Sequence, residues 1–535
     1  MKKLKFICFC KWCAVLALVG AVVSPQAAVL TVTSLAFVGP GTLRNQIAAS
    51  SPGDTIQFAV TGKIILGNSL LIPHTLYVQG PGPSLLTIDA NGVDRAFVVS
   101  GNPVFISGMT ISNGFVAGIN GTNGGLGQNG GTGAGLEGGA ILDTNSPGDI
   151  LVLSNCWVTA NTLMGGNGGQ GGTNPIGAAF SVTGGGGGYA WGGAIYFVGH
   201  VTNINCTFSQ NRAIAGKGGD GGLSMSGPGG TGGSGGGPAG GALSGFLNVD
   251  INCTFSGNSV SGGAGGNGGA SLAGAGGAGG QGNQGNDGGA INGFTSLTSC
   301  TVVSNSAFAG AGGLGGSGSP PGADGASGIG LAGGVFGETF SCFNTIGNTI
   351  LADNYADTSY SNYYSAWTDD GYNFIGSADV IVCPFGPTTV IGSVPAPIHP
   401  RLGPLAQNGS GLPTHSPWPI VNPMIVDQGN SLGLTTDERG APRPYHLGLP
   451  IPPGGDGSDI GAFELGSSDL GMGISKTNVV LSWPAWYGDL MVQSATSLQG
   501  SNWNYLSVTP YQVGSQLVVT NPMTNAMMFY RLISP

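Results

Sequence analysis

Short runs of alternating apolar and polar residues recur along the middle of the chain. In residues 248–255, NVDINCTF, the apolar Val, Ile, Cys and Phe alternate with polar residues. A period of two is typical of a β-strand with one buried face. We therefore expect Val249, Ile251, Cys253 and Phe255 to point into a core, with the residues between them facing outward.

Two phrases accompany these runs in a constant order, which indicates an internal repeat. The first, Cys-x-(Val/Phe)-x-x-Asn, ends at Asn161, Asn211, Asn258 and Asn305. The second, Gly-Gly followed by two apolar residues, begins at positions 138, 192, 240, 288 and 333.

Stacked coils of short parallel strands explain this repeat. Asparagine tolerates a left-handed backbone and bonds through its side chain, which suits a corner where a strand turns. The pattern predicts an all-β chain folded as a right-handed parallel β-helix, in which equivalent residues stack about 4.8 Å apart. The four repeated asparagines should then form a structural amide ladder; a binding role is the alternative.

Glycine, 107 of the 535 residues, is concentrated between each Asn phrase and the next Gly-Gly phrase. In residues 262–285 it recurs with a period of three, as at Gly262, Gly265 and Gly268. That period matches a left-handed extended helix with three residues per turn. Two interpretations are open: ordered excursions that leave the same point of successive coils and bond to one another, or five disordered loops.

The cysteines fit the same stacking. Six of them follow residue 28, and they are Cys156, Cys206, Cys253, Cys300, Cys342 and Cys383. Side-by-side residues on parallel strands do not suit disulfide geometry, so a buried thiol ladder is favoured, with disulfides between rungs as the alternative. The chain has no Cys-x-x-Cys pair or Cys/His cluster, so we predict no zinc site and no redox motif.

Residues 1–28 have the pattern of a secretory signal peptide. Four lysines precede the apolar run AVLALVGAVV, and small residues follow it. A membrane anchor is the alternative, although the apolar run is short for one. The chain carries a net charge of −10, and residues 1–28 contribute four positive charges and no acid. We therefore exclude nucleic acid and anionic lipid as partners, and we expect no membrane span after signal cleavage.

Two resemblances sharpen this picture. The GGAI phrases together with Phe208-x-x-Asn211 and Phe255-x-x-Asn258 resemble the repeat of the polymorphic outer-membrane proteins, which are bacterial β-helical surface proteins. The tail of about 65 residues departs from that family, since it is too short to supply a large C-terminal membrane barrel.

The second resemblance covers more of the chain. GYNFIGS, PRLGPLAQNGSGLPTH, VDQG, TTDERGAPRP and DIGAFE follow one another between residues 371 and 464, and this series is similar to the choice-of-anchor Q family. Residues 31–66 likewise resemble the start of secreted bacterial β-helix proteins. The resemblance implies a cell-surface or secreted β-helix without a general activity, and a short helix at 42–50 that caps the open end of the solenoid.

The densest group of charges lies in this second segment, and it comprises Asp437, Glu438, Arg439, Arg443, Asp459 and Glu464. A functional interpretation is a pair of carboxylates beside an arginine. The favoured interpretation is structural: the two arginines bond to acids and tie an irregular last coil together.

The chain divides into five parts on this reasoning. They are the signal peptide (1–28), an N-terminal cap with the first coils (29–137), the Gly-rich repeats (138–350), the last coils with a C-terminal cap (351–470) and a small β-sandwich (471–535). Five short strand patterns separated by turn residues predict the sandwich. Its Trp486, Tyr487 and Trp503 could stack on sugar, although core positions are favoured for most of these rings.

Catalytic patterns are weak. Between residues 100 and 350 the only basic side chains are Arg212 and Lys217, and the acids do not recur at one repeat position. Asp369 and Asp370 form the only adjacent aspartate pair, and no Gly-x-Ser-x-Gly motif occurs. We predict no catalytic, cofactor or metal residue.

These observations predict an extracellular or cell-surface, non-catalytic protein with a structural, adhesive or matrix-binding role. The alternative is a carbohydrate-active β-helix that binds or cleaves polysaccharide. Ice or mineral binding by a flat Gly-rich face is a third and weaker hypothesis. Extracellular polysaccharide or cell-surface components are the expected partners.

Overall fold

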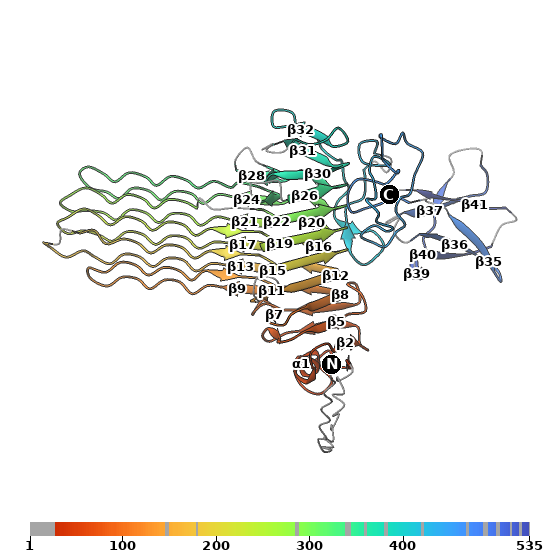
Figure 1. The fold of residues 1–535 in the computed structure, drawn as a ribbon, viewed down its shortest axis with the longest axis horizontal. Coiled ribbons are helices and arrows are strands. Elements are labelled where there is room, and N and C mark those ends of the chain that lie inside the picture. Colours follow the sequence, from red (N-terminus) through yellow and green to blue (C-terminus); the bar gives the residue numbers. More distant parts are fainter. Residues whose placement is uncertain are drawn as a thin grey trace, which may run out of the picture.

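The computed structural model describes residues 27–144, 149–177, 180–283, 288–337, 344–357, 361–378, 384–418, 422–466, 470–484, 490–498, 503–513, 516–523 and 527–533. Figure 1 shows a solenoid of stacked strands, a set of long parallel arms that project from one side of it, and a smaller β-domain at the C-terminal end. The predicted signal peptide lies outside the described residues except for its last two.

The solenoid is a parallel β-helix, as the sequence predicts. Its 23-stranded sheet is parallel throughout in its strand pairs and curls around the core. The strands are β1 (Val29–Val32), β2 (Thr55–Phe58), β3 (Gly62–Ile65), β4 (Leu70–Ile72), β5 (Leu76–Gln79), β6 (Leu86–Asp89), β7 (Phe97–Val99), β8 (Val104–Ser112), β11 (Ile141–Asp143), β12 (Ile150–Thr159), β15 (Ile195–Ile204), β16 (Thr207–Ser209), β19 (Leu243–Ile251), β20 (Thr254–Ser256), β22 (Ile291–Thr298), β23 (Thr301–Val303), β25 (Val335–Phe336), β26 (Asn344–Gly347), β27 (Ile350–Ala352), β29 (Tyr363–Tyr364), β30 (Trp367–Gly371), β31 (Phe374–Ala378) and β32 (Val390–Ser393).

Coils with and without a Gly-rich segment differ in length. Thr55 pairs with Tyr77 on the next coil, 22 residues later, whereas Thr207 pairs with Thr254, 47 residues later. The surplus is the excursion, so each repeat is one coil plus one pair of arms. The core runs unbroken through both kinds of coil, because equivalent apolar residues stack from rung to rung.

The predicted inward face of residues 248–255 is only half right. Cys253 and Phe255 are fully buried, but on β19 the buried side chains are Asn248 and Asp250, while Val249 and Ile251 are half-buried. The alternation is interrupted at Asn252, whose φ is 50°. A left-handed residue turns the chain at that corner, so the faces before and after it are not in phase.

The corners also differ from the prediction in detail. Each repeated asparagine of the Cys-x-(Val/Phe)-x-x-Asn phrase follows the left-handed residue instead of being it, as with Ala160 (φ 55°) before Asn161 and Gln210 (φ 56°) before Asn211. Left-handed asparagines occur one corner earlier, before three of the four described cysteines, as at Asn252, and Ser299 holds this position before Cys300. The repeated asparagine is needed for its side chain, which bonds to the next rung.

The Gly-Gly phrase has a separate reason for each glycine. Gly138 has a φ of 63°, which side chains rarely adopt. A Cβ on Gly139 would lie 2.1 Å from the carbonyl oxygen of Gly193 on the next coil. The first glycine has a left-handed backbone in three of the five phrases, at 138, 192 and 240, whereas the second is needed in the first four phrases for close contact with the next coil.

The N-terminal end is closed as the resemblance implies. Helix α1 (Leu43–Ala49) starts at the N-cap Thr42, whose side chain accepts a bond from the backbone N–H of Asn45, and it buries Leu43 and Ile47 against the core. The predicted helix at 42–50 is therefore present, next to the first coil (Figure 1).

The Gly-rich segments form ordered hairpins, each with an outgoing and a return arm. A six-stranded parallel sheet lies at the base of the outgoing arms. The five outgoing arms follow β9 (Phe115–Ala117), β13 (Thr162–Met164), β17 (Arg212–Ile214), β21 (Ser259–Ser261) and β24 (Ser306–Phe308), and the sixth strand, β28 (Tyr355–Ala356), pairs with β24. Return arms of the first three hairpins re-enter through β10 (Leu136–Glu137), β14 (Ala190–Trp191) and β18 (Pro238–Ala239). We call the ten arms the sheaf; Figure 1 shows them side by side.

Backbone hydrogen bonds hold the sheaf together in two directions. Within the outgoing layer, Gly168 N–H donates to the Lys217 carbonyl at 2.8 Å on the next arm. Between the layers, Gly219 N–H donates to the carbonyl of Gly185 at 2.8 Å, and Gly233 N–H donates to Gly219. This second series runs through both layers from Gly131 to Gly325. The three-residue period therefore assigns one glycine to each direction and leaves the third residue facing outward.

At several positions the third N–H of the period donates to a side chain on the outer face. Asn120 Oδ1 accepts from the N–H of Asn167 and Asn167 Oδ1 from that of Lys217, both at 2.8 Å. At the last hairpin the in-layer donors have no further arm. There the Asp357 carboxylate accepts from the N–H of Ala309 at 2.6 Å, which closes this edge of the sheaf.

Residues 401–418 and 422–466, the flank segment, lie along the side of the coils. They share a second apolar cluster with β23, β27 and β31, in which Ile350 and Phe374 meet Ile425, Ile460 and Phe463. Figure 1 shows this irregular chain beside the solenoid, between the stacked strands and the C-terminal domain.

The C-terminal domain is the predicted small β-sandwich. One sheet contains β35 (Gly471–Ser475), β36 (Asn478–Pro484), β39 (Tyr511–Val513) and β40 (Gln516–Pro522); the other contains β37 (Met491–Ala495), β38 (Asn504–Tyr505) and β41 (Phe529–Ile533). Leu481, Trp483 and Val519 lie in the core between them. The strand pattern of residues 502–508 is shorter than predicted, and β35 and β39 were not predicted.

Candidate functional site

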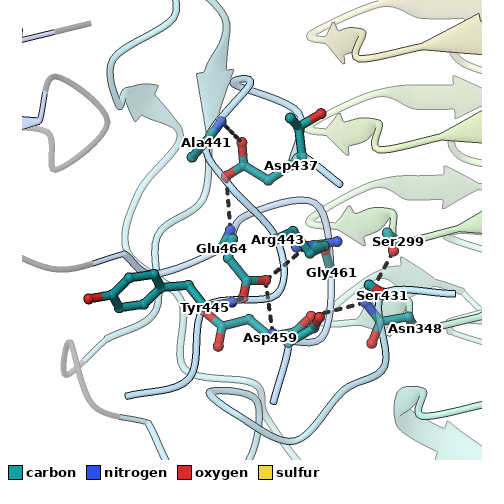
Figure 2. A network of polar contacts seen from close by, with 12 residues as sticks. Ser299, Asn348, Ser431, Asp437, Ala441, Arg443, Tyr445, Asp459, Gly461 and Glu464 are labelled. Atoms are coloured by element: carbon teal, nitrogen blue, oxygen red, sulfur yellow. Dashed lines mark hydrogen bonds and ion pairs between the residues drawn. The ribbon is translucent and has the colours of Figure 1, made fainter. Parts of the chain in front are cut away.

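The charged cluster predicted from the sequence comes together in the flank segment (Figure 2). Asp437 and Arg439 form an ion pair at 2.7 Å, and both side chains are completely buried. The Asp437 carboxylate also accepts the N–H groups of Ala441 and Glu464, both at 2.9 Å. The guanidinium carbon of Arg439 lies 3.5 Å from the centre of the Phe463 ring.

A second buried ion pair lies beside the first. Arg443 Nε meets Glu464 Oε2 at 2.8 Å, and Arg443 Nη2 donates to the carbonyl of Gly461. The same Glu464 oxygen accepts from the N–H of Asp459 at 3.0 Å. Burial raises the pKa of Glu464 to about 7, and burial followed by the charge of Glu464 raises the pKa of Asp459 well above its ordinary value.

Glu438 links this cluster to the solenoid wall. Its two carboxyl oxygens accept from the hydroxyls of Thr207 on β16 and Thr254 on β20. Burial raises the pKa of Glu438 well above its ordinary value. The carboxyl thus fastens the flank segment across two neighbouring rungs.

The geometry of this cluster supports the structural interpretation. All six charged side chains are buried, and most of their polar atoms bond to ion-pair partners, hydroxyls and backbone groups of the same chain, whereas Arg443 Nη1 is buried without a hydrogen-bond partner among the described residues. A polysaccharide could reach them only if the flank segment itself unfolded. The arginines do bond to acids as predicted, and these bonds tie parts of the flank segment to one another, while Glu438 joins that segment to the coils.

The cysteines form the predicted ladder. Cys156, Cys206, Cys253 and Cys300 are free thiols, fully buried, at equivalent positions of successive rungs. Burial is the largest cause of a raised pKa at Cys156 and Cys253, which disfavours the reactive thiolate there. Cys342 and Cys383 lie outside the described residues.

The repeated asparagines form a continuous amide ladder. Nδ2 of Asn161 donates to Oδ1 of Asn211, and the same contact joins Asn211 to Asn258 and Asn258 to Asn305, each at 2.9 Å. All four are buried. These contacts support the favoured role of the asparagines as a structural amide ladder. The ladder continues from Asn305 to Asn354.

The other sequence candidates do not gather into one site. The Asp369 carboxylate accepts from the N–H of Gly371 at 2.9 Å and from Thr389 and Asn373 side chains, so it organises a turn. Asp370 beside it has its pKa raised by burial and then by Asp369.

The acids and bases of the repeat region are equally dispersed. Lys217 pairs loosely with Asp220, at 3.7 Å, on the surface of the sheaf. Asp250 lies inside the solenoid, where Asn203 Nδ2 donates to it at 2.8 Å and burial raises its pKa to about 7. Within the described ranges, no group of three or more His, Cys, Asp or Glu side chains could hold a metal ion.

A row of aromatic rings at the root of the sheaf was missed by the sequence reasoning. Tyr189 and Trp191 stack with ring centres 4.2 Å apart, and Tyr196 on β15 follows at 6.3 Å from Trp191. The Tyr189 hydroxyl donates to Glu137 Oε1 at 3.1 Å. The sequence GYAWGGAIY (188–196) does place three aromatic residues around one Gly-Gly phrase. They were interpreted as part of the repeat and not as a separate group.

An acid–imidazole pair was also missed because its members are far apart in the chain. Nδ1 of His399 lies 2.5 Å from Oδ1 of Asp353, and both side chains are partly exposed. They border a cavity of about 330 Å³ that Ser361 and Ser377 also line. No local sequence pattern could have joined residues 353 and 399.

The aromatic residues predicted in the C-terminal domain make no platform in the described part. Trp503 is covered by Arg531, whose guanidinium carbon is 4.3 Å from the ring centre. Trp486 and Tyr487 lie outside the described residues. An apolar groove of about 700 Å³ does open between the two sheets, lined by residues such as Leu490, Leu506 and Val519.

No protein-family model matches this chain, and no curated protein matches it in sequence. The two family resemblances therefore stay predictions. In the part of the chain that the structure covers, no helix has the length and apolar character needed to cross a bilayer.

Proposed function

We propose that this is a secreted or cell-surface, non-catalytic β-helix protein that acts as a structural or adhesive scaffold in an extracellular matrix. The observation that supports it best is the sheaf. Ten arms are ordered by their own backbone bonds and present small, mostly uncharged side chains on two outer faces. Such an element offers a large, regular contact surface with few side chains that could take part in a reaction.

The rest of the molecule is consistent with this role. The buried ion pairs, the thiol ladder and the amide ladder all make contacts inside the protein, which supports a structural role for them. A solenoid with a closed N-terminal end and a covered flank provides a rigid base from which the sheaf projects. We propose an extracellular location, with polysaccharide or cell-surface components as partners.

Retention on the producing cells or their isolated matrix tests the proposal. Chain 29–535 should be retained, and a variant with Gly219→Val and Gly233→Val should be retained much less, because side chains at these positions meet backbone oxygens about 2 Å away. Gly186→Ala, at an outward position, is the matched control. Equal retention of all three proteins would contradict a role for the sheaf.

A carbohydrate-active enzyme is the second candidate. It is favoured by the Asp353–His399 pair beside its cavity, since an acid that orients an imidazole is an arrangement suited to a general base. Reducing-end and unsaturated-product assays test it. Cleavage that is lost in His399→Ala would overturn the non-catalytic proposal.

A further inference from the structure

The aromatic row at the root of the sheaf has an unusual degree of exposure. Trp191 is 37% exposed, although it lies on a strand whose preceding residue, Ala190, is fully buried. Elsewhere the largest fully buried rings, such as Phe208 and Phe255, point into the solenoid. Trp191 therefore is not a core residue, and it is exposed beside Tyr189 and Tyr196, with which it stacks.

The row is held rigidly. Tyr189 lies across the backbone of Gly135, where any Cβ would be 2.1 Å from its ring, and its hydroxyl is tied to Glu137. Arg95 in turn bonds the carbonyls of Glu137 and Gly138 at 3.0 and 2.9 Å. A platform fixed in this way loses little side-chain entropy when a ligand binds.

The chemistry of the row selects one class of ligand. Stacked indole and phenol rings offer a flat apolar surface with polar edges, and the neighbouring Glu137 offers carboxylate oxygens that accept hydrogen bonds. A pyranose ring matches this, because one face carries C–H groups and its rim carries hydroxyls. A polyanion is disfavoured by Glu137 and by the net charge of −10.

We infer that Tyr189, Trp191, Tyr196 and Glu137 form a binding site for a neutral polysaccharide chain, with a sugar ring stacked on Trp191. This inference rests on the proposed matrix role and gives that role a binding site. The sheaf would then provide a broad contact surface, and the aromatic row at its base would provide the specific site for a sugar.

Native affinity electrophoresis in gels that contain soluble mixed-linkage β-glucan or galactomannan tests the inference. Wild-type protein should be retarded in at least one of these neutral gels and not in alginate. Trp191→Ala should weaken retardation by roughly tenfold or more, as for a central aromatic contact. Trp191→Phe should recover part of it, and Trp418→Ala, which removes a 54% exposed tryptophan of the flank segment, should match wild type.

Circular dichroism melting of each variant checks that folding is intact. If Trp191→Ala does not fold, Tyr196→Ala and Glu137→Gln take its place, and each should weaken retardation. Absence of retardation in both neutral gels, or equal retardation of wild type and Trp191→Ala, would overturn the site. Matrix retention that still depends on Gly219 and Gly233 would leave the scaffold role standing.

Discussion

The solenoid and the sheaf are built from the same repeats but are held together differently. Inside the solenoid, side chains stack from rung to rung, as Phe208 on Phe255 with ring centres 4.9 Å apart. Inside the sheaf, neighbouring arms meet mainly through glycine backbone, and polar side chains such as Asn120 and Asn167 add hydrogen bonds on the outer face. The apolar core supplies a large stabilisation per residue, whereas each hydrogen bond contributes about 0.5–1.5 kcal/mol.

This difference shows which region organises the other. Ordering glycine costs more conformational entropy than ordering any other residue. A single pair of arms in water would therefore gain too little to stay ordered. Because the coils fix the roots of all ten arms at the spacing of the rungs, the arms are already side by side when their bonds form.

The largest expected effect comes from the charged network that only the solenoid side contains. Arg439→Ala leaves Asp437 buried without its partner, and loss of one member of a buried pair costs about 3–5 kcal/mol. Urea denaturation should show this loss in the free energy of unfolding, with sugar retardation of the folded variant unchanged. A midpoint equal to that of wild type would contradict the structural role.

A smaller, local effect is expected when one atom is added inside the sheaf. A Cβ at Gly219 would lie 1.9 Å from the carbonyl oxygen of Gly169, so Gly219→Ala must separate the arms, at a cost of about 1–3 kcal/mol. Hydrogen exchange should then accelerate in the arms of residues 165–189 and 215–237 but not in the coils.

The matched control is Gly186→Ala, where the nearest atom is the Thr132 methyl carbon at 3.2 Å. Its exchange should match wild type. Unprotected amides throughout the arms of the wild-type protein would instead support the disordered-loop interpretation.

Apart from these substitutions, a pH dependence is expected that is confined to the solenoid side. Glu464 and Asp250 have folded-state pKa values of about 7, above their unfolded values. Their protonated forms favour folding fully below pH 4, and this stabilisation is lost as pH rises to about 7, at up to about 1.4 kcal/mol per pH unit for each group.

Denaturation curves at pH 5 and pH 7.5 measure this effect, and unfolding should be easier at the higher pH. Carboxyls with lowered pKa values, such as Asp54 and Asp456, change the stability only below pH 4, so they do not affect the comparison between pH 5 and pH 7.5. Equal stability at both pH values would contradict the raised pKa values of Glu464 and Asp250.

Much of this could be predicted from the sequence because it repeats. The stacked cysteines, the amide ladder and the C-terminal sandwich each follow from a local pattern, and the N-terminal helix follows from the resemblance. The face of β19 could not be predicted, because Asn252 shifts the phase between two corners that look continuous in sequence. The Asp353–His399 pair and the aromatic row depend on coil-to-coil distances that no local pattern contains.

The sequence by itself determined the period, and therefore that glycine would recur wherever two backbones approach. Only the tertiary structure decided that the arms are ordered, because an arm of glycine is stable when neighbouring coils place a second arm within hydrogen-bonding distance. It also decided that Arg439, Arg443 and their acids are buried on the side of the coils. The contact of Glu438 with Thr207 and Thr254 forms only when the flank segment packs against the wall of coils, so it cannot be inferred from the sequence around residue 438.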